Sequence, residues 1–142
     1  MEETPPARAY LERALDVEPE NKCLRVTLAG NLAVSGKIPE AIARFEKLVE
    51  DYPGEAILHQ NLGIALGMTG EYGEAIASLE EAVRLVPTLA AYFNLAVAYR
   101  KTGQLGEAVR VLELYLQDPG DAPEVNVRRA RSELERLKAK LK

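Results

Sequence analysis

The stretch that decides the fold is "NLGIALGMTGEYGEAIASLEEAV", residues 61–83, which holds Gly63, Gly67, Gly70 and Gly73 within eleven positions. Such a density of glycine raises the question of a loop that binds phosphate in front of a helix. A phosphate loop requires a Gly-Lys-Ser/Thr ending or a preceding strand, and neither is present here. The glycines are therefore interpreted as serving helix packing and turning.

The pattern of this stretch recurs along the chain. Three segments of the sequence superimpose at intervals of 34 and 33 residues, as the turn glycines, the alanines and the leucines show: Gly36, Gly70 and Gly103; Ala41, Ala75 and Ala108; Leu28, Leu62 and Leu95. The N-terminal "ARAYLERALDVEPEN" matches the second half of the same unit. Since several copies stay in register, the repeat is a stronger signal than any single motif.

Each half of the repeat predicts one helix. In residues 56–88, Leu62, Ala65 and Leu66 form one apolar face, and Gly70 is placed to end that helix in a left-handed conformation. A second helix is expected over 71–85, with Ala75, Leu79 and Ala82 facing inward. Gly63 is expected where the two helices approach each other closely.

The two ends of the chain differ. The first helix is expected to start at Pro5, where the missing N–H costs little, and to have no preceding helix that covers it. This suggests either a piece of a longer array or pairing of two chains. The last helix, residues 123–141, carries an apolar stripe of Val127, Ala130, Leu134, Leu137 and Leu141.

This 34-residue helix–turn–helix pattern resembles the tetratricopeptide repeat (TPR) family over nearly the whole chain. The family favours a large aromatic residue early in the first helix, whereas this chain has Arg25, His59 and Tyr92 there. The resemblance implies an all-α, right-handed solenoid of about eight helices in one domain, 1–142. Its expected parts are a half-repeat at 4–20, three repeats at 22–55, 56–88 and 89–122, and a capping helix at 123–142.

Composition favours a soluble globular chain, with 47% hydrophobic and 28% charged residues and a net charge of -4. A lone cysteine gives no sign of an oxidising compartment, and no apolar run reaches the roughly 20 residues of a membrane span. A cytoplasmic protein is expected, unless a targeting segment was removed. The basic residues after Pro123 alternate with Glu133 and Glu135, which favours a solvated helix face over nucleic-acid or membrane binding.

No constellation of catalytic residues stands out. His59 has no serine or cysteine nearby in the repeat, so a packed histidine is favoured over a catalytic base. Cys23 has no second cysteine or histidine at the spacing of a metal site. We therefore expect no enzyme activity, no cofactor and no metal.

The resemblance implies instead a partner in the concave groove lined by the first helix of each repeat. Residues expected to face this groove are Val26, Gly30, Val34, Ile57, Gln60, Asn61, Ile64, Met68, Phe93, Asn94, Val97, Arg100 and Lys101. Solvated helix faces are normally polar, so this apolar row predicts the binding of an apolar helix or peptide. The two asparagines either hold a peptide backbone or belong simply to the family pattern.

TPR domains that bind the acidic C-terminal tails of chaperones use a clamp of lysine, arginine and asparagine. The matching positions here are Val26, Gly30, Asn61, Ala90 and Asn94, and Asn61 alone agrees. Because the cations are missing, chaperone tails are disfavoured as partners. The alternative function is self-assembly of the chain through the groove or through the uncovered first helix.

Overall fold

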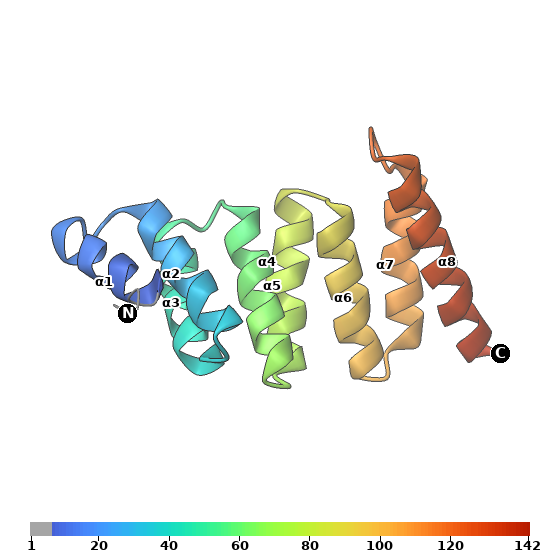
Figure 1. Ribbon diagram of the computed structural model, residues 1–142. Helices are drawn as coiled ribbons and strands as arrows, with labels where there is room; N and C mark the ends of the chain where they lie inside the picture. Colours follow the sequence, from blue (N-terminus) through green and yellow to red (C-terminus); the bar gives the residue numbers. More distant parts are fainter. Residues whose placement is uncertain (1–6) are drawn as a thin grey trace, which may run out of the picture.

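The computed structural model describes residues 7–142, and the start of the first helix expected at Pro5 lies outside them. The described residues form helices and no strands (Figure 1). The eight helices are α1 (Ala7–Val17), α2 (Lys22–Val34), α3 (Ile38–Asp51), α4 (Ala56–Met68), α5 (Tyr72–Leu85), α6 (Leu89–Lys101), α7 (Leu105–Gln117) and α8 (Glu124–Leu141). The all-α solenoid of eight helices predicted from the repeat is therefore confirmed.

The turn glycines end the first helix of each repeat as predicted. Gly36, Gly70 and Gly103 have φ angles of +81°, +83° and +78°, a region that other residues rarely adopt. At the end of α4 the Glu71 N–H donates to the Leu66 carbonyl at 3.0 Å, and the Gly70 N–H donates to the Gly67 carbonyl at 3.2 Å. This pair of bonds is a Schellman motif, which satisfies the last carbonyls of the helix and reverses the chain.

Consecutive helices pack against each other in sequence order, and their apolar faces form two clusters. The first cluster draws on α2, α3 and α4, and it ends at Ala75 on α5. The second cluster begins at Leu79, one turn further along α5, and extends through α6 and α7 to α8. Helix α5 therefore joins the two halves of the core.

Close packing of α4 on α5 explains Gly63, as the sequence predicted. A Cβ atom at this buried position would lie 2.6 Å from Cγ of Leu79 and 3.1 Å from the Ala75 carbonyl oxygen. By contrast, a Cβ at Gly67 would have no heavy atom within 4 Å. The two glycines of α4 thus have different roles, one in packing and one on an open surface.

The apolar stripe of α8 is confirmed for four of its five residues: Val127, Ala130, Leu134 and Leu137 are buried. The prediction was wrong for Leu141, whose side chain is 52% exposed. Leu141 is the last residue of α8, and Leu137, one turn earlier, is the last residue of the stripe that belongs to a core cluster.

A buried tyrosine links α5 to α6. The Tyr99 hydroxyl donates a hydrogen bond to the Glu80 carboxylate, and burial together with this bond raises the pKa of Tyr99 to about 12. The folded state therefore favours the protonated hydroxyl of Tyr99. The resulting contribution to the free energy of unfolding is complete below pH ~10, the usual pKa of tyrosine, and is lost as pH rises toward 12.

We therefore expect wild type to be more stable than Tyr99→Phe at neutral pH, with a difference that shrinks between pH ~10 and ~12. Urea unfolding of both proteins across this range measures the difference, and phenylalanine keeps the packing of the ring as an internal control. A difference that stays constant with pH would contradict the assignment.

Candidate binding groove

The residues predicted to line the groove lie on α2, α4 and α6, and several are aliphatic side chains in contact with solvent. Val34, Ile57, Ile64, Met68 and Val97 are all exposed, Ile64 to 38%. Each helix also supplies a buried face to the core, so α4 and α6 are apolar on two sides. A second apolar face on a surface helix is typical of an interaction surface.

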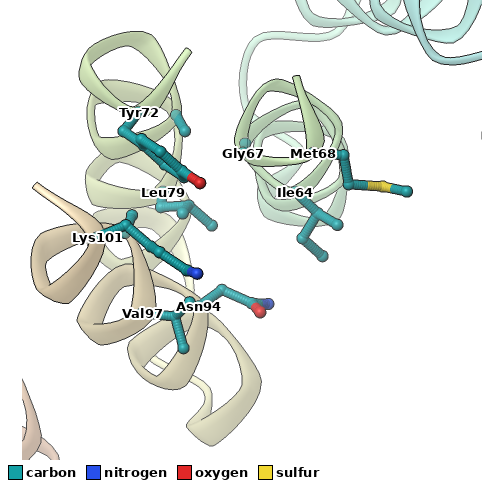
Figure 2. Close-up of a pocket in the computed structure, with 11 residues that line it drawn as sticks. Ile64, Gly67, Met68, Tyr72, Leu79, Asn94, Val97 and Lys101 are labelled. Carbon is teal, nitrogen blue, oxygen red and sulfur yellow. The ribbon is translucent and has the colours of Figure 1, made fainter. Parts of the chain in front are cut away.

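A pocket of about 210 Å³ lies between α4, α5 and α6, and we call it the α4–α6 pocket (Figure 2). Five of its lining residues are among the predicted groove residues: Ile64, Met68, Asn94, Val97 and Lys101. In Figure 2 the side chains of Ile64, Asn94 and Lys101 point into a shared space, whereas that of Met68 extends away from α6. The structure thus brings these residues of two successive repeats to one hollow.

Helix α5 contributes Tyr72 and Leu79 to the same pocket, and sequence reasoning missed both. Tyr72 is half-buried and Leu79 is buried at the floor of the pocket, beside Gly63 and Gly67 of α4, which line it as well. The two glycines four residues apart on one helix face were the available signal for this opening.

Further hollows also contain predicted groove residues. One of about 360 Å³ lies at the start of α4 and is lined in part by Ile57, Gln60 and Val86. Another, of about 380 Å³, lies between α6 and α8 and includes Phe93, Val97 and Arg100. The predicted residues of α4 and α6 therefore line several depressions, and Val97 belongs to two of them.

Helix α8 supplies charged side chains to this last hollow, which the sequence analysis treated as a solvated face. The guanidinium of Arg129 lies 4.9 Å from the centre of the Phe93 ring, a cation–π arrangement. The Glu133 carboxylate lies 3.6 Å from Nη1 of Arg100 and 3.0 Å from Nη1 of Arg136. Phe93 and Arg100 are therefore partly covered by the chain's own last helix.

The predicted groove residues of α2 are less closely grouped. Val26 packs against the first core cluster and Gly30 is half-buried, whereas Val34 is almost fully exposed. Asn61 on α4 is half-buried, and within residues 7–142 neither its side chain nor that of Asn94 forms a hydrogen bond. Both amides thus have donors and acceptors available to a ligand.

The histidine and cysteine occupy separate, ordinary environments. His59 is buried, and its Nε2 donates a hydrogen bond to the Pro53 carbonyl at 2.7 Å, which explains the residue as a packed link between α4 and the preceding loop. Cys23 is exposed on α2. Among the described residues no three His, Cys, Asp or Glu side chains are grouped to hold a metal, and no helix is long and apolar enough to cross a membrane.

A row of repeated helical hairpins with an exposed apolar groove defines the class of this protein as a helical repeat protein. Two family models described as "Tetratricopeptide repeat" match residues 5–66 and 61–123. The chain belongs to the tetratricopeptide repeat family. No match is found among curated proteins.

Solved structures with a similar fold include SycD and MamA. One is the Yersinia enterocolitica type III secretion translocator chaperone SycD, in a structure described as an alternative dimer. SycD is 27% identical to this chain with a TM-score of 0.77, and the match covers 87% of this chain and 96% of SycD. MamA AMB-1 is 27% identical with a TM-score of 0.68, over 75% of this chain. The chain spans 63% of the length of MamA.

A third structure shares the fold at lower identity. PcrH, described in complex with the chaperone binding region of PopD, is 21% identical with a TM-score of 0.75 over 83% of this chain and 91% of PcrH.

Proposed function

We propose that this chain is a non-catalytic binding module that holds an apolar helix or peptide of a partner protein in the groove of α4 and α6. The observation that carries the proposal is the α4–α6 pocket, where Ile64 and Val97 stay exposed beside a deeper apolar floor formed by Leu79. Covering such a surface with an apolar side chain removes both from water, which is favourable.

The size of the pocket supports a side chain rather than a small molecule as its occupant. Pockets for small molecules and cofactors usually measure ~300–1,000 Å³, and this one measures about 210 Å³. A cavity of roughly 150 Å³ is enough to hold a benzene ring. A single leucine, methionine or phenylalanine side chain of a bound peptide therefore suits it.

Likeness to the chaperones agrees with this proposal. SycD is described as a translocator chaperone, and PcrH is described with a bound region of another protein. For this chain the partner is proposed only as a class, an apolar segment of a protein.

Ile64→Glu is expected to weaken peptide binding by about tenfold or more, because it places a charge against the apolar floor of the pocket. The measurement is fluorescence anisotropy with labelled peptides that wild type selects from a displayed random library. Leu114→Glu on α7 is the matched control, since Leu114 is 43% exposed and lines none of the hollows of the groove.

Circular dichroism melting establishes that both variants remain folded. Equal affinities of wild type and Ile64→Glu for the selected peptides would contradict binding in this groove, as would equal losses in the two variants.

A second candidate function is self-assembly, favoured by the outer face of α1. Tyr10 is 55% exposed and Val17 is 80% exposed, and α1 has no fully buried residue. Light scattering over a dilution series tests this: a stable dimer that Tyr10→Glu converts to a monomer supports it. A monomer at every concentration excludes it.

A further inference from the structure

The positive charges of the groove gather at the end formed by α6 and α8. Arg100, Lys101, Arg129 and Arg136 line the hollows there, and Glu133 is the acidic residue among them. The whole chain, in contrast, has a net charge of -4. This end of the groove is therefore cationic on an otherwise acidic protein.

These cations differ in how far the chain itself neutralises them. The Glu133 carboxylate lies near both Arg100 and Arg136, so one negative charge is shared by two guanidinium groups. Within residues 7–142, Lys101 and Arg129 form no ion pair. Arg129 is instead held over the Phe93 ring, which fixes its position without cancelling its charge.

The position of Lys101 connects this charge to the apolar pocket. Lys101 lines the α4–α6 pocket together with Ile64 and Val97, and Figure 2 shows its side chain reaching toward the space that they border. Val97 also lines the hollow between α6 and α8, which contains Arg100, Arg129 and Arg136. A bound segment whose apolar side chain enters the pocket therefore has its neighbouring residues beside Lys101 and, past Val97, beside α8.

The hollow at the start of α4 carries no such excess of positive charge. The hollow at the start of α4 is lined by Ile57, Gln60 and Val86, and its one charged residue, Glu55, forms an ion pair with Lys22. The groove thus has no cation in the hollow at the start of α4 and several cations between α6 and α8. This asymmetry favours one direction for a bound segment whose charges are also unequal.

We propose that the partner segment is acidic: an aliphatic or aromatic side chain fills the α4–α6 pocket, and adjacent Asp or Glu side chains meet Lys101 and Arg129. The inference rests on the proposed function, which it deepens by naming the charge of the partner. Opposite charges in a partly desolvated groove speed association and fix the register, and they disfavour basic segments. Lys101 and Arg129 lie at positions other than those of the clamp for chaperone tails. The proposed acidic groups are therefore side-chain carboxylates within a segment.

The test uses a displayed library of random peptides selected on the whole chain of 142 residues. Peptides with an apolar residue flanked by Asp or Glu are expected to dominate. Each is then compared with a counterpart in which Asn and Gln replace Asp and Glu, and the counterpart is expected to bind about tenfold more weakly. The affinity of the acidic peptide, but not that of its counterpart, is expected to fall as ionic strength rises.

Lys101→Glu and Arg129→Gln are expected to abolish most of the difference between the acidic peptide and its neutral counterpart. The matched control is Arg13→Glu on α1, an exposed arginine outside every hollow of the groove, and it should leave the difference unchanged.

The outcomes separate this inference from the function on which it rests. If the selected peptides are apolar without acidic residues and bind Ile64→Glu more weakly than wild type, the proposal of an acidic partner is wrong and binding in the groove still holds. Peptides indifferent to Ile64→Glu overturn both, and so does a library that yields no binding peptide.

Discussion

Replacing Gly63 with leucine is expected to lower the free energy of unfolding by about 3 kcal/mol and to make unfolding less cooperative. A single Cβ atom at this site would already lie 2.6 Å from Cγ of Leu79, and leucine adds three more carbons. The Ala75 carbonyl oxygen, at 3.1 Å from the same Cβ, belongs to the backbone and cannot rotate aside. Helices α4 and α5 must therefore move apart.

Loss of cooperativity follows from where Gly63 lies in the core. Leu62 and Ala75 belong to the first cluster, and Leu79 belongs to the second. Stability of a repeat protein is approximately the sum of its repeats and the interfaces between neighbours. Separating α4 from α5 weakens the contact that joins the clusters, so each half can then unfold with less effect on the other.

Urea unfolding followed by circular dichroism and by tyrosine fluorescence measures both effects. Gly67→Ala is the control on the same helix, because its Cβ meets no atom within 4 Å and alanine suits a helix interior better. This control is expected to raise stability by about 0.5–1 kcal/mol. A single, coincident transition of unchanged stability in Gly63→Leu would contradict the role assigned to the close contact.

The repeat was predictable from the sequence because its determinants are local. A turn glycine fixes a left-handed residue, and apolar positions three and four apart fix the buried face of each helix. Gly63 was predictable for the same reason, since repeats 1 and 3 have Ala29 and Ala96 at its position. These features depend on spacing within one hairpin, and the structure confirms them.

Contacts between distant parts of the chain were less predictable. Tyr72 reaches the pocket from α5 because α4 has glycine, without a side chain, at the positions that line the pocket beside it. Arg129 stacks on Phe93 because α8 packs beside α6. The positions of the TPR repeat predict which way each residue faces from its helix. They do not predict which side chain from another helix covers that residue. The exposure of Leu141 was missed similarly, because it depends on where the packing of α8 against other helices ends rather than on the stripe itself.

Leu137→Ala on α8 is expected to destabilise the protein by about 3 kcal/mol, because its side chain is 1% exposed and its truncation leaves a cavity. Leu141→Ala is the matched control: it makes the same change one turn later on the same stripe. Because Leu141 is 52% exposed, its loss is expected to cost under about 1 kcal/mol. Urea unfolding of the two variants and wild type measures the costs, and equal costs would contradict the docking of α8 seen here.

The same pair of variants tests whether α8 takes part in binding. Leu137 belongs to the second core cluster, which holds α8 against the preceding helices, while Arg129 on α8 faces the groove. If α8 completes the cationic end of the groove, Leu137→Ala, which loosens α8, weakens the binding of an acidic peptide more than that of its neutral counterpart. This comparison is made at temperatures where the rest of the chain is folded. Leu141→Ala should leave both affinities unchanged. Equal weakening of the two peptides by Leu137→Ala would indicate that α8 supports the fold but supplies no charge to the partner.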